Sequence, residues 1–232
     1  MLSREARDCS SDNCFNTMTT LIINYGAGNL LSVKRAVEYC NAPVIVSSDP
    51  NIFNKQQVGH IILPGVGAFA TGMANLKKQG WIASLQEAVL HQKIPLLGIC
   101  LGMQLLASWG HEGHEDLTPG LGFIEGEVVS LKPSSHQERV PHMGWSEVHQ
   151  QQESPLLHGI PNTSQFYFAH SYYVKPIDEQ FIIATTDYTQ RFTAILANNH
   201  IMGIQFHPEK SSQFGLKLIK NFLTCNLKGK EK

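Results

Sequence analysis

The stretch Pro95-Leu96-Leu97-Gly98-Ile99-Cys100-Leu101-Gly102-Met103-Gln104 decides what fold and chemistry this chain is expected to have. An apolar run leads to a cysteine between two glycines, and a helical pattern follows at once. This order is typical of a nucleophile elbow, a sharp strand-to-helix turn that lifts one reactive side chain clear of a sheet. Because the helix begins at the cysteine, its free N–H groups and its dipole favour a thiolate at Cys100. Glycine is needed on both sides because the turn leaves no room for side chains and strains the backbone.

Cys100 also has a purely structural interpretation, because a cysteine in an apolar run is often an inert core residue. A catalytic thiol needs a base, and His207-Pro208-Glu209 follows the apolar stretch 201–206. The Glu209 carboxylate, two residues on past a stiff proline, can orient the His207 ring for proton transfer. An isolated His-x-Glu is more often a solvated surface loop. In the same chain as an elbow cysteine, however, it favours catalysis.

The glycine turn Gly65-Val66-Gly67 closes another apolar stretch. Bare N–H groups on such a turn can hold an anion, which suggests a donor for the oxyanion of a tetrahedral intermediate. The two glycines and Ala70 also match a loose form of the dinucleotide-binding fingerprint. That fingerprint needs an acidic residue at the end of the next strand, whereas Glu87 falls inside a predicted helix and the next strand ends at Cys100. Nucleotide binding is therefore the weaker hypothesis.

Residues 111–116 are rich in side chains that bind metals. The two histidines are three residues apart rather than the four of the zincin helix motif, and Gly113 and Pro119 favour a loop. We therefore expect a solvated acidic turn here, and neither a metal nor a cofactor.

Composition and charge narrow the class of protein. The 232 residues suffice for one large domain with a real core. A net charge of −1 gives no electrostatic basis for binding nucleic acid or a membrane surface, and no apolar stretch approaches the ~20 residues that cross a bilayer. The five cysteines are irregularly spaced and include no Cys-x-x-Cys pair, which indicates neither a disulfide framework nor a zinc site. These features predict a cytoplasmic protein.

The first half of the chain alternates strands with helices. Apolar stretches predict strands and helical spacing predicts helices, with strands at 20–25, 43–46, 60–63 and 94–99 and helices at 30–40 and 73–92. Strands that are apolar throughout indicate an α/β fold with a mostly parallel central sheet and helices on both faces. Ligands bind beyond the carboxyl ends of such strands, so we expect Gly26, Gly65 and Cys100 to gather at one edge.

The second half is richer in strands. Four segments are strand-like and one is helical, namely 123–131, 165–174, 181–186, 192–205 with a hairpin turn at Asn198-Asn199, and a final helix at 212–225 that buries Phe214, Leu218, Phe222 and Cys225. Residues 1–18 are polar, carry charges of both signs and lack an apolar segment. We expect them to form a disordered N-terminal extension ahead of one domain at 19–232. Translation from Met18 is the alternative.

Taken together, the motifs identify a resemblance to the class I glutamine amidotransferases, from about residue 20 to the C-terminus. Gly-Ile-Cys-Leu-Gly-Met-Gln, Pro-Gly-Val-Gly and His-Pro-Glu-Lys-Ser occur in the order typical of that family, whose fold is flavodoxin-like. Three further matches are similar to the glutaminase subunits of imidazole glycerol phosphate synthases, namely Asn24-Tyr25-Gly26-Ala27-Gly28-Asn29-Leu30, Pro141-His142-Met143-Gly144-Trp145 and Phe166-Tyr167-Phe168-Ala169-His170-Ser171-Tyr172.

The resemblance implies a glutaminase with a Cys-His-Glu triad. Cys100 would be the nucleophile that attacks the side-chain amide of glutamine, His207 its base and acid, and Glu209 the group that orients His207. The oxyanion would be met by the N–H of Leu101 and, after a rearrangement of the glycine turn, by that of Val66. The family's remaining glutamine-binding positions match Gly67, Gln104, Ser171 and Tyr172.

The resemblance also implies a partner. In these synthases ammonia passes through a (β/α)8-barrel subunit, which makes imidazole glycerol phosphate and an aminoimidazole carboxamide ribotide, and the glutaminase is nearly silent alone. Asn29, Tyr167 and Lys210 match positions that line the contact between the two subunits. Close relatives are thought to feed ammonia to enzymes that modify bacterial surface sugars, and this alternative stays open because Ala68 and Ser146 depart from the expected residues. A catalytically dead binding module is a third hypothesis, but the intact triad argues against it.

Overall fold

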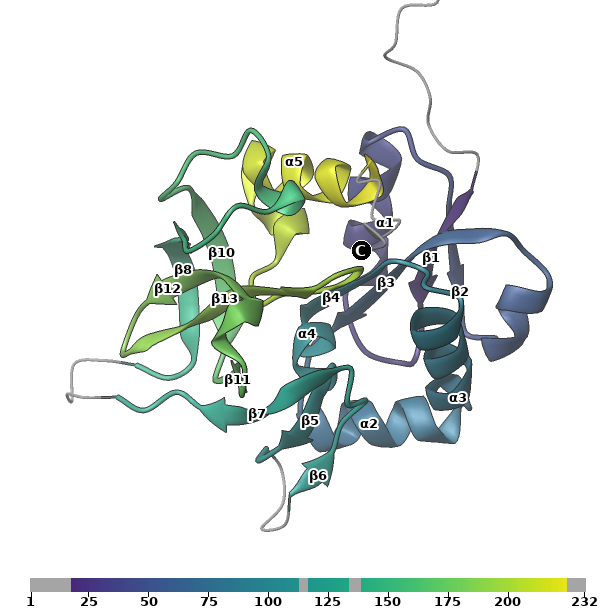
Figure 1. Ribbon diagram of the computed structural model, residues 1–232, viewed down its shortest axis with the longest axis horizontal. Coiled ribbons are helices and arrows are strands. Elements are labelled where there is room, and N and C mark those ends of the chain that lie inside the picture. The colour runs from purple at the N-terminus through teal and green to yellow at the C-terminus, as the bar shows by residue number, and fades with distance from the viewer. Residues whose placement is uncertain (1–17, 113–116, 134–138, 225–232) are drawn as a thin grey trace, which may run out of the picture.

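The computed structural model describes residues 18–112, 117–133 and 139–224. In this part of the chain, eight strands form a central sheet (Figure 1). Their order is β2 (Val44–Ser47), β1 (Thr19–Ile23), β3 (Val58–Gly65), β4 (Leu96–Cys100), β14 (Ile201–Ile204), β13 (Arg191–Asn198), β12 (Ile182–Asp187) and β9 (His149–Gln150). The first five are mutually parallel and the rest antiparallel. The order β2-β1-β3-β4 is that of the flavodoxin-like fold, so the predicted fold class is confirmed.

Helices cover both faces of this sheet (Figure 1). On one side lie α1 (Leu30–Tyr39) and α5 (Ser212–Thr224), and on the other α2 (Phe69–Lys78), α3 (Trp81–Gln86) and α4 (Leu101–Leu105). The alternation of side chains along β1 divides the core accordingly. Ile22 packs in the cluster beneath α1 and α5, whereas Leu21 and Ile23 pack in the cluster beneath α2 and α3.

The helix predicted at 73–92 is wrong as one continuous element. It begins earlier, at Phe69, and breaks at Gly80, whose φ of +79° lies in the left-handed region that glycine adopts most readily. After this break α3 continues into a π-helical turn, Glu87–His91. Both helices keep an apolar face in the core, because Leu76 of α2 and Trp81 and Leu85 of α3 are fully buried.

Two smaller sheets complete the second half. One pairs β10 (Gln165–His170) with β8 (His142–Glu147), and the other has the order β11 (Tyr172–Pro176), β7 (Ile124–Ser130), β5 (Ala107–Gly110) and β6 (Thr118–Pro119). The single strand predicted at 165–174 is therefore wrong. The chain leaves one sheet at His170 and enters another at Tyr172, so that Ser171 lies at the junction. The predicted hairpin is confirmed by the pairing of Asn198 with Ile201, although its turn is at Asn199-His200, one residue later than predicted.

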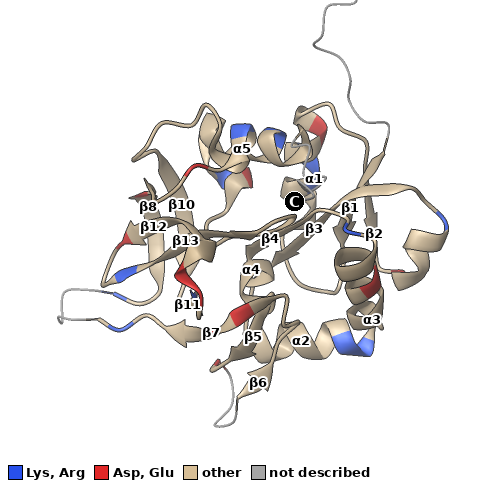
Figure 2. Cartoon of the chain, viewed as in Figure 1, with Lys and Arg blue, Asp and Glu red and all other residues tan. Residues whose placement is uncertain are grey.

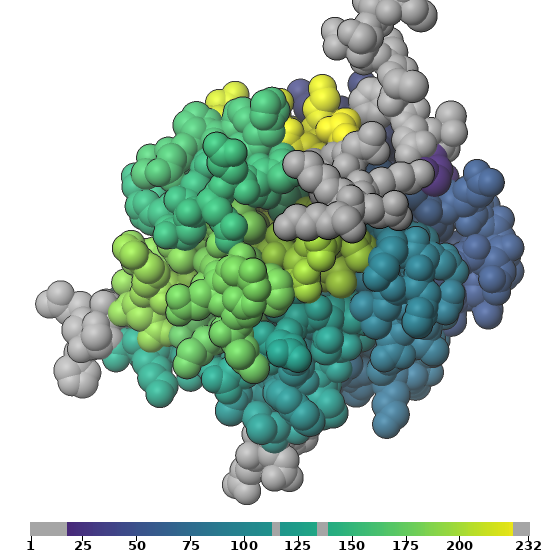
Figure 3. Space-filling model, viewed as in Figure 1, coloured from purple at the N-terminus to yellow at the C-terminus, as the bar shows by residue number. Residues whose placement is uncertain are grey.

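The two halves of the chain pack against each other in the space-filling view (Figure 3). Basic and acidic residues are scattered over α1, α2, α3, α5 and the connecting loops in Figure 2. Within the described residues, no helix combines the length and the hydropathy that crossing a bilayer requires. The predicted extension lies outside the described residues up to position 17, as does Cys225, while Met18 is half-buried beside Gly59.

Candidate active site

Cys100 lies at the carboxyl end of β4, where the elbow was predicted. Its φ of +54° and ψ of −110° place it in a strained turn between β4 and α4. The parallel register sets Gly65 of β3 directly beside it, and Gly28 packs against Gly65. Gly65 and Cys100 are therefore side by side as expected, whereas the glycine that packs against Gly65 is Gly28, and the expected Gly26 faces Asn75 and Gln79 instead. The helix after the cysteine is shorter than the sequence suggested, because α4 ends at Leu105 and β5 begins two residues later.

His207 and Glu209 meet Cys100 at this edge. His207 follows β14, the parallel neighbour of β4, and its Nδ1 lies 2.9 Å from Oε1 of Glu209. Both side chains are almost fully buried, with exposed fractions of 5% and 2%. Burial by itself lowers the pKa of His207, but hydrogen bonding to Cys100 and to Glu209 outweighs it and raises the pKa to about 10. The raised pKa favours the positively charged imidazole, protonated on both nitrogens, at neutral pH.

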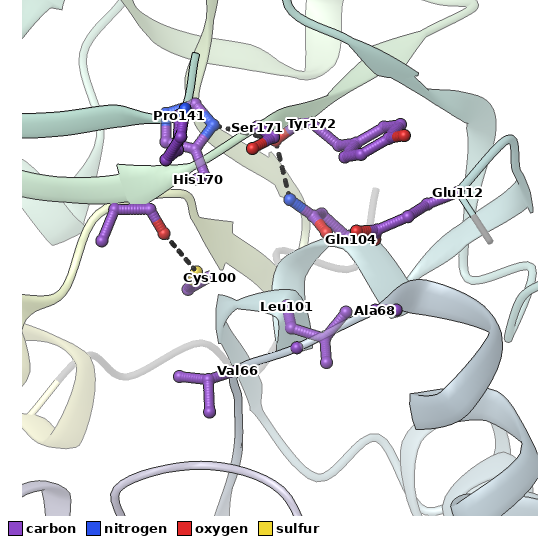
Figure 4. Close-up of a pocket in the computed structure, with 12 residues that line it drawn as sticks. Val66, Ala68, Cys100, Leu101, Gln104, Glu112, Pro141, His170, Ser171 and Tyr172 are labelled. Carbon is purple, nitrogen blue, oxygen red and sulfur yellow. Dashed lines mark hydrogen bonds between the residues drawn. The ribbon is translucent and has the colours of Figure 1, made fainter. Parts of the chain in front are cut away.

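A cavity of about 300 Å³ opens over the sulfur (Figure 4). This volume is at the small end of ligand pockets and suits an amino acid. Its described lining consists of Val66, Gly67, Ala68, Cys100, Leu101, Gln104, Glu112, Pro141, Ala169, His170, Ser171 and Tyr172. In Figure 4, Val66, Ala68 and Leu101 lie below the sulfur, and Pro141, His170, Ser171 and Tyr172 lie above it.

All the oxyanion and substrate-binding residues expected from the sequence line this cavity, namely Val66, Gly67, Leu101, Gln104, Ser171 and Tyr172. Gln104 is held in place from two sides. Its Nε2 donates to the Tyr172 carbonyl at 2.8 Å and to Oε1 of Gln205 at 3.2 Å. Gln205 in turn contacts the Cys100 sulfur at 3.8 Å. The pocket wall and the sulfur therefore belong to one hydrogen-bonded network.

The three residues expected at a partner contact do not line the cavity. Lys210 is exposed, and its Nζ lies 5.6 Å from the ring centroid of half-buried Tyr167, which suits a cation–π contact. Half-exposed Trp145 packs edge-on against the same ring. Asn29 is exposed at the start of α1, where its side chain accepts a hydrogen bond from the N–H of Ser32. Tyr167, Lys210 and Trp145 therefore form a cluster at the surface, and Lys210 directly follows Glu209 in the sequence.

Glu112 is a pocket residue that sequence reasoning did not single out. Its carboxylate accepts a hydrogen bond from the N–H of Phe69 at 2.9 Å, at the start of α2. Ala68 precedes that helix and has no side chain to cap it, so Glu112 supplies the missing acceptor. Burial raises the pKa of the Glu112 carboxyl, partly offset by this hydrogen bond. The sequence placed Glu112 in an acidic loop, but no local signal linked that loop to the elbow.

His170 and His142 were quoted only as parts of motifs, yet both are buried beside the cavity. Nδ1 of His142 lies 3.2 Å from Nε2 of His170, and Nε2 of His142 lies 2.8 Å from the hydroxyl of Ser146. Burial lowers the pKa of His142 to about 4 and that of His170 to about 3. Both imidazoles are therefore neutral at neutral pH, next to the charged His207.

These two histidines should make the fold sensitive to acid. In the unfolded chain they bind protons below about pH 6.5, whereas the folded chain resists protonation until about pH 4 and pH 3. The contribution of these two histidines to stability is thus intact above pH 6.5 and falls as the pH drops through the acid range. At pH 5 each histidine should lower the free energy of unfolding by up to about 2 kcal/mol relative to pH 7. Urea unfolding at pH 7 and pH 5 measures the loss.

His170→Asn should remove about half of this pH dependence, because one of the two titrating groups is gone. The matched control is His91→Asn, which replaces an exposed histidine and should leave the pH dependence unchanged. Equal stability of the parent protein at pH 7 and pH 5 would contradict the expectation.

Comparison with known proteins places these features in a family. The model of the family described as glutamine amidotransferase class-I matches residues 21–225. The chain belongs to the class I glutamine amidotransferases. One similar relative is "Imidazole glycerol phosphate synthase subunit HisH 1" of Campylobacter jejuni, which is 48% identical over 87% of this chain and 98% of the relative's length. The protein of the same name in Methanococcus maripaludis is 45% identical over 87% of this chain and 97% of the relative's length.

Solved structures of similar proteins share the fold. A putative GMP synthase component from Thermoplasma acidophilum superposes with a TM-score of 0.67 at 17% identity, covering 89% of this chain and 92% of its own. A glutamine amidotransferase from Thermotoga maritima gives a TM-score of 0.60 at 16% identity, covering 89% and 82%. At these identities the likeness concerns the fold alone.

Proposed function

We propose that this chain is the glutaminase subunit of an imidazole glycerol phosphate synthase, a cytoplasmic enzyme that hydrolyses glutamine to glutamate and ammonia. One observation carries the proposal. Nδ1 of buried His207 lies 2.9 Å from Oε1 of Glu209 at the sheet edge that carries Cys100, beside a cavity of amino-acid size that opens over the sulfur. The names of relatives that match 87% of the chain at 45–48% identity support this synthase as the assembly.

In the proposed reaction, the Cys100 sulfur attacks the side-chain amide carbon of glutamine and forms a C–S bond. The proton on His207 passes to the amide nitrogen, and the C–N bond breaks to release ammonia. Water then attacks the thioester and gives a proton to His207, and the C–S bond breaks to release glutamate. Glu209 stays bonded to Nδ1 throughout, which keeps Nε2 turned toward the sulfur.

Two backbone donors would stabilise the oxyanion. The N–H of Leu101 is in the first turn of α4 and has no partner within that helix. The second donor in this proposal is the N–H of Val66, which borders the cavity on the glycine turn. Val66 is 48% exposed, and a rearrangement of this turn would bring its N–H to the oxyanion.

The rest of the cavity would hold the amino-acid end of glutamine. Gln104 and the segment Ser171-Tyr172 offer polar groups on one wall, and Gly67 borders the other. Glu112 also borders the cavity, and its carboxylate would pair with the α-ammonium group. Glutamine binding would therefore join one charged contact to several neutral hydrogen bonds.

Ammonia would pass to a (β/α)8-barrel subunit that makes imidazole glycerol phosphate and aminoimidazole carboxamide ribotide in histidine biosynthesis. Tyr167 and Lys210 are the residues proposed to contact it, together with Asn29. The backbone N–H of His207 donates to the Tyr167 carbonyl at 2.9 Å. A partner that contacts Tyr167 would thus contact a residue whose carbonyl is hydrogen-bonded to the backbone of His207. The alternative is the same glutaminase serving an enzyme that modifies a bacterial surface sugar.

Partner stimulation tests the assignment. Glutamate release should be slow for the chain alone and rise by about 10²–10³-fold when the barrel partner and its ribotide ligand are added, the range expected if the partner completes one oxyanion donor. Coupled glutamate dehydrogenase assays measure it, and Lys210→Ala should weaken the stimulation. Full activity without a partner would contradict the expected activation of the glutaminase by its partner. Stimulation by a sugar amidotransferase but not by the barrel would favour the alternative.

A further inference from the structure

The wall of the cavity opposite the oxyanion turn depends on a junction between two sheets. β10 ends at His170 in the two-stranded sheet, and β11 begins at Tyr172 in the four-stranded sheet. Ser171 lies between them and borders the cavity. The Ser171 carbonyl accepts a backbone hydrogen bond from the N–H of Leu131 at 2.8 Å, whereas the Tyr172 carbonyl accepts from side chains.

The Tyr172 carbonyl is where side chains fix this junction. It accepts one hydrogen bond from Nε2 of Gln104 at 2.8 Å and a second from Nδ1 of His170 at 2.8 Å (Figure 4). A carbonyl oxygen has two lone pairs, and both are engaged here. Gln104 reaches it from α4, and His170 reaches it from β10.

His170 is itself fixed by two further residues. A carbonyl can only accept, so Nδ1 of His170 carries the proton and Nε2 of the neutral ring is an acceptor. His142 must then donate from Nδ1 to His170, which leaves its own Nε2 to accept from the Ser146 hydroxyl. The neutral pair therefore has one proton arrangement. His142 is also stacked between Phe168 and Tyr188, with ring centroids 4.9 and 4.0 Å away.

We propose that Ser146, His142 and His170 act as positioning residues, a hydrogen-bond relay that fixes the Tyr172 carbonyl and thereby the Ser171-Tyr172 wall on which glutamine is held. This deepens the proposed function and rests on it. The relay starts on β8, the strand that also carries the exposed side chains Met143 and Trp145. It therefore links the pocket wall to a strand with apolar side chains at the surface. None of the three residues transfers a proton in the reaction.

The burial of the relay supports a permanent structural role. His142 and His170 are 2% and 6% exposed, and Cys100 and His207 are the titratable groups that face them from the catalytic side. Burial lowers the pKa of both histidines, so neither adds a second positive charge beside His207. A neutral relay leaves the charge of the catalytic pair undisturbed.

Glutamine binding to full-length Cys100→Ala, in which no turnover occurs, tests the relay by calorimetry. Adding His170→Leu removes the donor to Tyr172 and should raise the Kd about tenfold. Adding His170→Asn should keep the Kd within about threefold of the parent, because the Asn amide nitrogen can take the place of Nδ1. Ser146→Ala should raise the Kd about threefold, since it leaves a buried acceptor unpaired.

The matched control is Ser164→Ala. Ser164 is buried and Ser146 half-buried; the Ser164 hydroxyl donates to the Pro161 carbonyl at 2.7 Å, but Ser164 does not border the cavity. Its loss should leave the Kd unchanged. A Leu variant that binds like the parent, an Asn variant as weak as the Leu variant, or equal effects at Ser164 and Ser146 would overturn the relay.

A second measurement separates the relay from the proposed substrate. Ring ¹⁵N NMR of the full chain at pH 7 should show both His142 and His170 as neutral, Nδ1-protonated tautomers. An Nε2-protonated His170 would overturn the relay whatever the protein binds. If the parent binds no glutamine, the proposed function fails, and the tautomers still decide whether the relay exists.

Discussion

Replacing Cys100 by alanine is expected to lower glutamate release by about 10⁴-fold or more, the scale on which removal of a nucleophile acts when base and orienting group form a unit with it. The sulfur is the atom that bonds to the amide carbon in the proposed reaction, and alanine offers nothing in its place. The assay is glutamate release by the chain with its barrel partner at saturating glutamine. Normal turnover by Cys100→Ala would overturn the mechanism.

Cys40→Ala is the matched control for this loss. Cys40 is also a buried free cysteine, with 5% of its surface exposed, but it faces the Leu216 carbonyl of α5 rather than the cavity. Its removal should leave turnover unchanged and cost stability only through the small cavity it creates. Cys100→Ala should keep the stability of the parent within about 1 kcal/mol, because alanine fits the same space. Activity and stability are thus expected to separate at these two positions.

The elbow and the parallel half of the sheet could be predicted because their signals are local. Short apolar stretches predicted the strands β1 to β4, and the glycines on either side of Cys100 predicted the turn. Parallel strands have their carboxyl ends at one edge, so Cys100 and Gly65 could be expected together without any distance. The meeting of His207 with Cys100 rested on resemblance, since 107 positions separate them in the chain.

The features that were missed depend on contacts distant in sequence. Residues 165–174 do not reveal locally that the chain changes sheets at Ser171, because strand-forming residues stand on both sides of the polar pair His170-Ser171. Glu112 borders the cavity only because the N–H of Phe69 holds its carboxylate. The break at Gly80 was visible as a glycine, but a glycine inside a helical pattern is often tolerated.

Gly102→Ala is expected to cost about 3 kcal/mol or more in the free energy of unfolding. A Cβ at this position would overlap the carbonyl oxygen of Leu63 in β3, and backbone in a central strand cannot move aside as a side chain does. Gly98 is bound by the same constraint, because its Cβ would lie 2.6 Å from the carbonyl oxygen of Gly102. The elbow therefore depends on close contact between β3, β4 and α4. Urea unfolding of the variant measures the cost.

Gly72→Ala in α2 separates this steric cost from the general effect of removing a glycine. The atoms nearest to its Cβ would be the side-chain ends of Leu101 and Leu105 at 3.1–3.3 Å, which can shift, and alanine favours the helix. Its effect on stability should stay within about 1 kcal/mol of the parent. If Gly102→Ala proved as mild as Gly72→Ala, the close contact of α4 with β3 would be wrong. The strained backbone turn that presents the Cys100 sulfur to the cavity would then lack its structural basis, since that contact holds the turn in place.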